Sequence, residues 1–215
     1  MKITTVFFDF DGTLANTIPG IMATMAVVKE KMNADFSLAE AEALIGKPLV
    51  NMGEILVGAK KSAEFLNIYL ESFPEHGGKM IKFFNGIEEM LKNLKAQNIE
   101  TAVITSKRGR SLNNNLTVLN AHDYFDLLVT SDSTIFHKPH PAPVEFALDR
   151  MGKDAKECVM VGDTEYDILA GKGAYVKTIG VTWGIEKDMK NANYCPDYIA
   201  NSPQELYKII ISLTK

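Results

Sequence analysis

The sequence predicts an α/β fold in which a doubly wound, Rossmann-like parallel sheet carries a small inserted all-helical domain. Short apolar runs recur along the chain, and patterns with helical spacing separate them. Strands and helices that alternate in this way form a parallel sheet with helices on both faces. One long stretch, residues 16–82, breaks the alternation and contains only helix-like sequence. A crossover normally needs one helix, so we interpret this stretch as a separate cap domain.

Five apolar runs are predicted to be strands buried on both faces. They span residues 3–8, 101–105, 127–130, 158–161 and 178–181. Apolar residues spaced three and four apart predict helices over residues 87–94 and 144–151. Ser37 and Glu40 form a candidate capping box in the inserted stretch, and Ser202 is expected to cap the last helix. We therefore predict a core domain from residues 1–15 and 83–215, with residues 16–82 as the cap.

The composition favours a small ligand over a polymer or a membrane. The 215 residues carry a net charge of −4, so the chain lacks the overall basic character typical of nucleic-acid or anionic-lipid binding. The apolar N-terminal run is interrupted by Asp9 and Asp11, so it predicts neither a signal peptide nor a membrane span. The two cysteines form neither a metal-binding spacing nor a disulfide framework. We expect a cytoplasmic protein, and a monomer and a homodimer are both compatible with the sequence.

Residues 9–14, with the sequence Asp-Phe-Asp-Gly-Thr-Leu, directly follow the first predicted strand. Strand side chains alternate, so the Asp9 and Asp11 carboxylates start on the same side. Such a pair repels unless a proton or a cation lies between the two groups, and oxygen ligands favour Mg²⁺. The structural alternative is a strand that ends in an Asp-Gly turn. A calcium loop is disfavoured because Thr13 and Leu14 interrupt its acidic spacing.

Two further motifs offer groups for an anion. Thr105 and Ser106 stand where a predicted strand ends and a helix begins, so a hydroxyl and free N–H groups there could hold phosphate. Ser106 could instead be an ordinary helix N-cap. Lys138 lies in a Lys-Pro-His-Pro segment whose prolines stiffen the loop and could fix its ammonium in place. A solvated surface lysine is the structural alternative for that residue.

The fourth motif is Gly-Asp-Thr-Glu-Tyr-Asp at residues 162–167, again after an apolar run. Asp163 falls at the strand tip, and Asp167 follows one helical turn later on the same side. These residues could simply cap a helix and interact with its positive end. Taken together, however, all four motifs lie at the carboxyl ends of predicted parallel strands, which is where open sheets bind their ligands.

This set of motifs resembles the haloacid dehalogenase (HAD) superfamily over the whole chain, and the helical insertion resembles the cap of its phosphoglycolate phosphatase, pyrophosphatase and beta-phosphoglucomutase branch. The resemblance implies a Mg²⁺-dependent phosphatase that hydrolyses a small phosphorylated metabolite. Asp9 would be the nucleophile and Asp11 the general acid and base. Thr105 and Ser106 would bind the phosphoryl group, and Lys138 would neutralise its charge.

The resemblance also implies the ligands of the metal. They would be the Asp9 carboxylate, the backbone carbonyl of Asp11 and Asp163, with Asp167 acting mainly through water. True dehalogenases lack the second aspartate of the opening motif, so the presence of Asp11 disfavours dehalogenation. Many relatives carry Asp-Ser where this chain has Asn16-Thr17, which leaves open any hinge contact that depends on the acid.

Three alternatives to a phosphatase remain at this stage. A sugar phosphomutase of the same family would return the phosphoryl group to an intermediate. A phospho-aspartate signalling receiver would carry its acceptor later in the chain and lack a cap. A regulatory protein without turnover should have lost one of the motif residues, and all are present.

Substrate choice is expected to depend on the cap, where residues 45–49 resemble the specificity loop of capped relatives. Lys47 could meet a second anionic group, or it could be a solvated residue between a helix-stopping Gly46 and Pro48. Arg108 and Arg110 follow the phosphate motif, and either could contact substrate or solvent.

Overall fold

The computed structural model describes residues 2–190 and 194–214. Six strands form one parallel sheet in the order β3-β2-β1-β4-β5-β6. The strands are β1 (Thr5–Phe8), β2 (Glu100–Ile104), β3 (Leu127–Val129), β4 (Cys158–Gly162), β5 (Lys177–Val181) and β6 (Tyr198–Ala200). The first five correspond to the five predicted runs. The sixth, a three-residue strand at the sheet edge, was missed.

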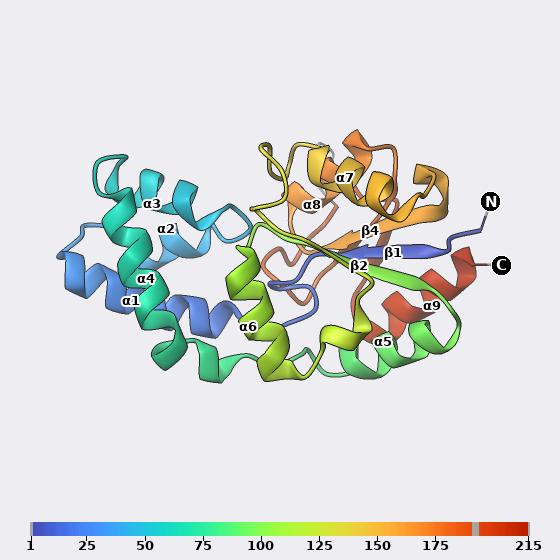
Figure 1. Cartoon of the computed structure of the whole chain (residues 1–215), viewed down its shortest axis with the longest axis horizontal. Helices are drawn as coiled ribbons and strands as arrows, with labels where there is room; N and C mark the ends of the chain where they lie inside the picture. The colour runs from blue at the N-terminus through green and yellow to red at the C-terminus, as the bar shows by residue number, and fades with distance from the viewer. Residues whose placement is uncertain (1, 191–193, 215) are drawn as a thin grey trace.

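The alternation of side chains along β1 divides the core into two layers. Val6 and Phe8 face one hydrophobic cluster, and Phe7 faces the other. The first cluster includes residues of α5 (Ile87–Ala96), α6 (Gly109–Leu119) and α9 (Pro203–Leu213), and the second includes residues of α7 (Ala142–Met151) and α8 (Glu165–Gly173). Figure 1 shows α7 and α8 above the central strands and α5 and α9 below them. The sheet is therefore doubly wound, as predicted.

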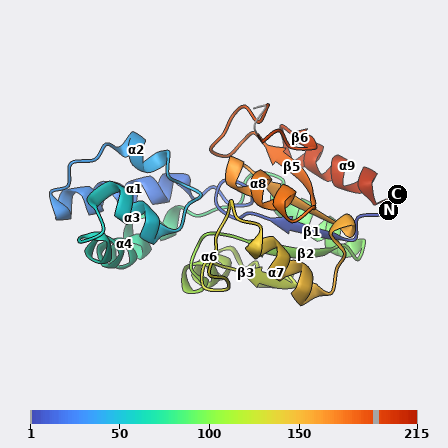
Figure 2. The same ribbon diagram turned by 90° about the horizontal axis from the view of Figure 1, so that it is seen from above.

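Between β1 and α5 the chain forms four α-helices, which are α1 (Ile18–Met32), α2 (Leu38–Glu42), α3 (Leu49–Val57) and α4 (Ser62–His76), and then a short 3₁₀ helix at Gly78–Met80. The four α-helices share a separate hydrophobic cluster that contains Met25, Phe65 and Tyr69. The predicted capping box is confirmed, since the Ser37 hydroxyl accepts a hydrogen bond from the Glu40 N–H. Figures 1 and 2 show these helices beside one end of the sheet, away from the two termini. We call them the cap helices.

The two connections between the cap helices and the sheet run side by side. Ala15 forms an antiparallel bridge with Phe83, and the Asn16 N–H donates to the Lys82 carbonyl at 2.8 Å. The predicted boundaries, at residues 15/16 and 82/83, fall at this pairing. The division into two domains that move relative to each other remains a proposal.

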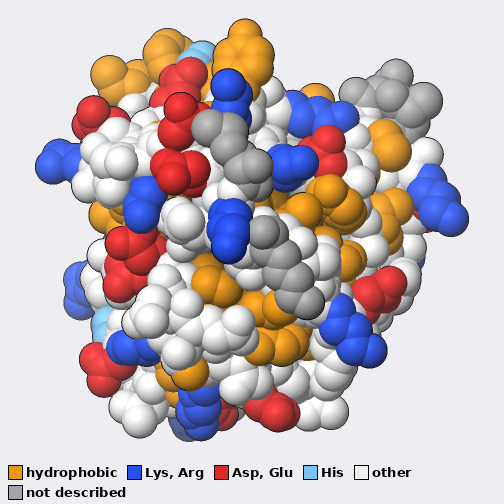
Figure 3. Space-filling view, turned by 90° about the vertical axis from the view of Figure 1, so that its right-hand side faces the viewer, with side chains coloured by type: hydrophobic (Ala, Val, Ile, Leu, Met, Phe, Trp, Pro, Cys, Tyr) orange, Lys and Arg blue, Asp and Glu red, His pale blue; other side chains and the backbone are white. Residues whose placement is uncertain are grey.

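The surface opposite the cap helices carries both signs of charge. Figure 3 shows Lys and Arg side chains interspersed with Asp and Glu on this face. Among the helices that the structure describes, none is long and apolar enough to cross a membrane.

Candidate active site

The sheet topology brings the four motifs together at one edge. Strand β1 lies between β2 and β4, and Phe8 pairs in register with Val103 on one side and Val161 on the other. The residues that follow these strands therefore emerge beside one another. Asp9, Thr105 and Asp163 all lie at this edge and are buried.

Lys138 reaches the same point from the loop before α7, and it is buried rather than solvated. Its ammonium lies 2.6 Å from an Asp9 oxygen and 2.6 Å from an Asp167 oxygen, and it donates to the Ile104 carbonyl at 2.9 Å. Burial alone would lower the pKa of Lys138, but the two carboxylates outweigh this effect and raise it. Lys138 is thus a fixed positive charge beside Asp9.

Asp163 is enclosed on several sides. Its carboxylate accepts hydrogen bonds from the Thr13 hydroxyl at 2.8 Å and from the Ile185 N–H at 2.7 Å. A Cβ atom on Gly12 would lie 2.2 Å from an Asp163 oxygen, and a Cβ atom on Gly184 would lie 2.1 Å from it. The backbone at both glycines therefore packs so closely against the Asp163 carboxylate that no side chain fits. Gly12 also has a φ of +88°, which favours glycine.

Asp9, Asp163 and Asp167 form a buried cluster that could hold a metal ion, since one oxygen from each lies within 4.8 Å of the others. Burial raises the pKa of Asp9 to about 7 despite the nearby ammonium of Lys138. Burial, together with the charges of Asp9 and Asp167, raises the pKa of Asp163 well above its usual range. Among the described residues, the Lys138 ammonium pairs with Asp9 and Asp167 and no ammonium pairs with Asp163, so the ionised cluster is short of positive charge. A divalent cation with oxygen ligands fits this donor set.

The Asp11 carboxylate is not part of this cluster of Asp9, Asp163 and Asp167 and has partners of its own. One Asp11 oxygen accepts a hydrogen bond from the Thr17 hydroxyl at 2.5 Å, and the other lies 3.1 Å from the Lys107 ammonium. The chain turns at residues 12–14, directly after Asp11, with Gly12 in the left-handed region. Each aspartate therefore has its own lysine partner.

The phosphate motif also differs in detail from the sequence analysis. Helix α6 begins at Gly109 after an N-cap at Arg108, so the interpretation of Ser106 as the N-cap is wrong. The Ser106 hydroxyl is buried and has no hydrogen-bond partner among the described residues. The Thr105 hydroxyl accepts a hydrogen bond from the Lys107 N–H at 3.2 Å. Ser106 is therefore free to bind an added group.

Asp167 also bonds to the start of its own helix. The Thr164 N–H and hydroxyl both donate to one Asp167 oxygen, at 3.1 and 2.9 Å, while the other oxygen faces Lys138. The capping interpretation of this motif is thus confirmed, and its role in the site stays a prediction.

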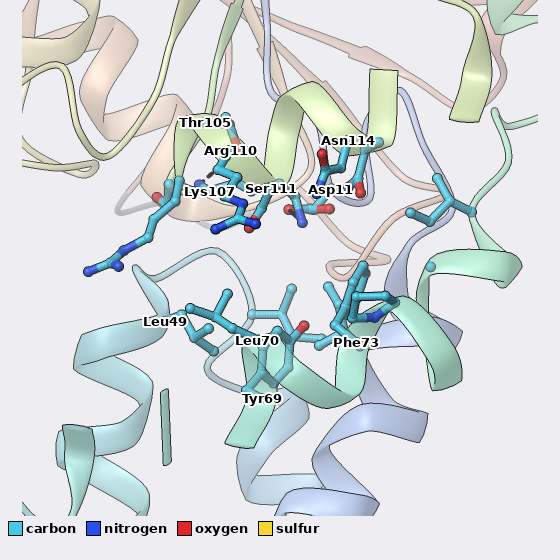
Figure 4. A pocket seen from close by; sticks show the side chains of 18 of the residues that line it. Asp11, Leu49, Tyr69, Leu70, Phe73, Thr105, Lys107, Arg110, Ser111 and Asn114 are labelled. Atoms are coloured by element: carbon cyan, nitrogen blue, oxygen red, sulfur yellow. Dashed lines mark hydrogen bonds and ion pairs between the residues drawn. The ribbon is translucent and has the colours of Figure 1, made fainter. Parts of the chain in front are cut away.

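A cavity of about 920 Å³ opens beside Asp9 and Asp11, between the sheet edge and the cap helices. Lys47, Arg108 and Arg110 all line it. The Lys47 ammonium lies 4.5 Å from the centroid of the Tyr166 ring, so this side chain is in contact with the core rather than simply solvated. Figure 4 shows Lys107, Arg110 and Asp11 on one side of the cavity and Leu49, Tyr69 and Phe73 on the other.

Sequence reasoning missed three contributions to the site. Lys107 is not among the residues predicted for the site, and Thr17 was noted only as a departure from the common pattern. No sequence motif indicates Gly184, because its role is to leave room for the Asp163 carboxylate, which is distant in the sequence. All three contributions depend on tertiary contacts, so no local pattern in the sequence indicates them.

Known proteins share this fold along nearly the whole chain. The model of the haloacid dehalogenase-like hydrolase family matches residues 6–181. Pyrophosphatase PpaX of Bacillus velezensis is 31% identical over 209 residues, which cover 97% of this chain and 96% of that protein. Pyrophosphatase PpaX of Halalkalibacterium halodurans is 31% identical over 211 residues, which cover 98% of each chain.

Solved structures that resemble this chain also carry phosphatase names. A predicted phosphatase from Clostridium acetobutylicum superposes with a TM-score of 0.88 at 26% identity, over 99% of this chain and 100% of that chain. A predicted phosphoglycolate phosphatase from Haemophilus somnus gives a TM-score of 0.84 at 26% identity, over 97% and 98% of the two chains. The chain belongs to the haloacid dehalogenase-like hydrolase family.

Proposed function

We propose that this hydrolase is a Mg²⁺-dependent phosphatase that acts on a small phosphorylated metabolite through a phosphoryl group carried by Asp9. The metabolite would be a phosphoglycolate-like ester, a sugar phosphate or pyrophosphate, as the names of the relatives suggest. The observation that carries the proposal is the separation of the two aspartates. Asp9 lies in the buried cluster with Lys138, while Asp11 lies beside it in the cavity with partners of its own.

In the first step an Asp9 oxygen attacks phosphorus in line, and the bond from phosphorus to the leaving oxygen breaks. Asp11 donates a proton to that oxygen, so an alcohol, or phosphate in the case of pyrophosphate, leaves and an aspartyl phosphate remains. In the second step water attacks phosphorus, Asp11 takes the proton from that water, and the Asp9–phosphorus bond breaks. Inorganic phosphate is released, and both aspartates return to their starting states.

The groups around Asp9 fit the charge of a phosphoryl group. Lys138 supplies a fixed positive charge, and the free Ser106 hydroxyl and buried Thr105 can hold phosphoryl oxygens. Phosphate esters resist hydrolysis so strongly that positioning and charge neutralisation must supply most of the rate enhancement. A site with these buried ionic groups provides both.

Asp9, Asp163 and the Asp11 carbonyl would hold Mg²⁺, with Asp167 acting mainly through water. When bound, the ion would neutralise negative charge on the phosphoryl oxygens and on the carboxylates. Asp163 is prepared for this role by Thr13 and the Ile185 N–H, which fix its carboxylate. The cap helices would exclude bulk water during the reaction and open to release products.

The direct test measures phosphate release from phosphate esters and pyrophosphate by purified protein, with Mg²⁺ or with EDTA. We expect Mg²⁺-dependent release that Asp9→Asn abolishes while the circular dichroism spectrum is unchanged. Asp149→Asn, which changes an exposed aspartate of α7, is the matched control. Appreciable release by Asp9→Asn would overturn the nucleophile assignment. Return of the phosphoryl group to a sugar, seen by product analysis, would indicate a phosphomutase instead.

A further inference from the structure

The cavity beside Asp9 is much larger than its phosphoryl-binding end requires. Its volume of about 920 Å³ lies near the top of the range of about 300–1,000 Å³ that is typical of sites for drug-sized ligands. Pyrophosphate and phosphoglycolate would leave most of this space filled with water. The size therefore points to a substrate with a larger organic body.

The wall that the cap helices contribute is mainly apolar. Figure 4 shows Leu49, Tyr69, Leu70 and Phe73 facing the cavity from this side. Tyr69 is buried, and Leu70 is 36% exposed. Apolar side chains stabilise a bound apolar group roughly in proportion to the apolar surface area that binding removes from water. Pyrophosphate offers no such area, so this wall would add nothing to its binding.

The inserted segment and the core are in contact around the cavity. The Lys47 ammonium lies on the Tyr166 ring at 4.5 Å, and Ile185 of the core packs against the hydrophobic cluster of the cap helices. The Lys107 ammonium lies 5.6 Å from the centroid of the Phe73 ring. The apolar wall is therefore held opposite the sheet edge by contacts on several sides.

The opposite wall, formed by α6 and the loop before it, is rich in hydrogen-bond donors. Asn115 is 2% exposed, lines the cavity, and has a side-chain Nδ2 without a partner among the described residues. A buried donor without an acceptor is unfavourable, so a ligand acceptor at this position would stabilise the complex. Arg110 lies on the same wall, and within the described parts of the chain no carboxylate pairs with it.

We propose that the preferred substrate is a phosphate monoester whose alcohol is an apolar or aromatic body of about nucleoside size that carries hydrogen-bond acceptors. This inference rests on the proposed phosphatase activity and assigns a larger leaving group than the names of the relatives suggest. The phosphoryl group lies at Asp9, the flat apolar face lies against the cap helices, and the acceptors face Asn115 and Arg110. Hydrolysis of this ester adds water across the phosphorus–oxygen bond and yields the free alcohol and inorganic phosphate.

The test compares kcat/KM for four probes in Mg²⁺: adenosine monophosphate, naphthyl phosphate, phosphoglycolate and pyrophosphate. We expect the first two to exceed the last two by at least about tenfold, the size of effect that one well-formed hydrophobic contact gives. A preference for pyrophosphate or phosphoglycolate would overturn the inference and leave the proposed function intact. Absence of Mg²⁺-dependent release from all four probes would overturn both.

Two variants locate the preference in the cavity. Leu70→Asp should lower the ratio of kcat/KM for naphthyl phosphate to that for pyrophosphate about tenfold, because it places a charge in the apolar wall. Ile55→Asp is the matched control, since Ile55 is an exposed cap residue that does not line the cavity. Asn115→Leu should reduce kcat/KM for adenosine monophosphate more than for naphthyl phosphate, which lacks acceptors in its ring. Equal ratios in Leu70→Asp and Ile55→Asp would contradict the assignment of the apolar wall.

Discussion

The Lys107 ammonium lies 3.1 Å from a carboxylate oxygen of Asp11, and both side chains line the same cavity. The same ammonium lies 5.6 Å from the Phe73 ring of α4, so one lysine contacts both the proposed acid-base group and a cap helix. Thr17, which immediately precedes α1, holds the other Asp11 oxygen. The position of Asp11 is therefore linked to both ends of the inserted segment.

Replacing Lys107 by Met should lower kcat about tenfold or more with a smaller change in KM, because an Asp11 carboxylate without its partner is less well oriented for proton transfer. General acid-base groups contribute about 10²–10⁴-fold to rates, so partial misalignment can cost this much. Steady-state kinetics on a phosphate ester check the result. Lys60→Met, at an exposed lysine, is the control. An unchanged kcat in Lys107→Met would show that the ion pair does not support Asp11.

Thr17→Val should also reduce kcat, because valine keeps the size of threonine but cannot donate to Asp11. The loss of one hydrogen bond to a charged group corresponds to about 1.5–3 kcal/mol, or roughly tenfold to a hundredfold. Thr17→Ser keeps the hydroxyl and should retain most of the activity. If both variants lose the same activity, the effect comes from packing of this buried residue and not from the hydrogen bond.

Gly12→Ala should destabilise the protein more than Gly58→Ala. Both glycines have positive φ, of +88° and +80°, so both substitutions carry a backbone cost of about 1–3 kcal/mol. A Cβ on Gly12 would also lie 2.2 Å from an Asp163 oxygen, whereas nothing lies within 4 Å of a Cβ on Gly58. Urea unfolding in EDTA measures the difference. Equal losses in the two variants would mean that the site relaxes around the added methyl group.

The protein without metal should lose stability as pH rises from about 4 to about 7. The pKa of Asp9 is about 7 in the folded state against 3.8 for the ordinary group, so the folded state binds the proton more tightly and this contribution disappears over that range. Asp163 acts in the same direction. Bound Mg²⁺ should offset the repulsion once the carboxylates ionise. We expect Mg²⁺ to raise Tm more at pH 8 than at pH 5, and a larger rise at pH 5 would contradict this account.

Much of the site was predictable because its polar residues directly follow strands that can be recognised in the sequence as short apolar runs. Short buried runs locate β1, β2 and β4, and the polar residues directly after them must share one edge of a parallel sheet. Asp9, Thr105 and Asp163 follow from this rule alone. Their catalytic roles came from the family resemblance and remain proposals.

Other features depend on contacts between distant segments. Thr17 and Lys107 meet at Asp11 only after the chain has folded, so no local pattern reports them. Strand β6 has three residues and one neighbour, which gives too little periodicity to recognise. Ser106 was a candidate helix cap because serine is a common N-cap residue. Helix α6 instead begins at Gly109, whose N–H donates to the distant Asp132 carboxylate at 2.7 Å.

The central claim is that Asp9 carries the phosphoryl group during turnover. Rapid acid quenching of the enzyme with a radiolabelled phosphate ester, followed by peptide mapping, tests it most directly. The account predicts label on the peptide that contains Asp9 and no label in Asp9→Asn. Rapid phosphate release without label on that peptide, or with label on another residue, would contradict it.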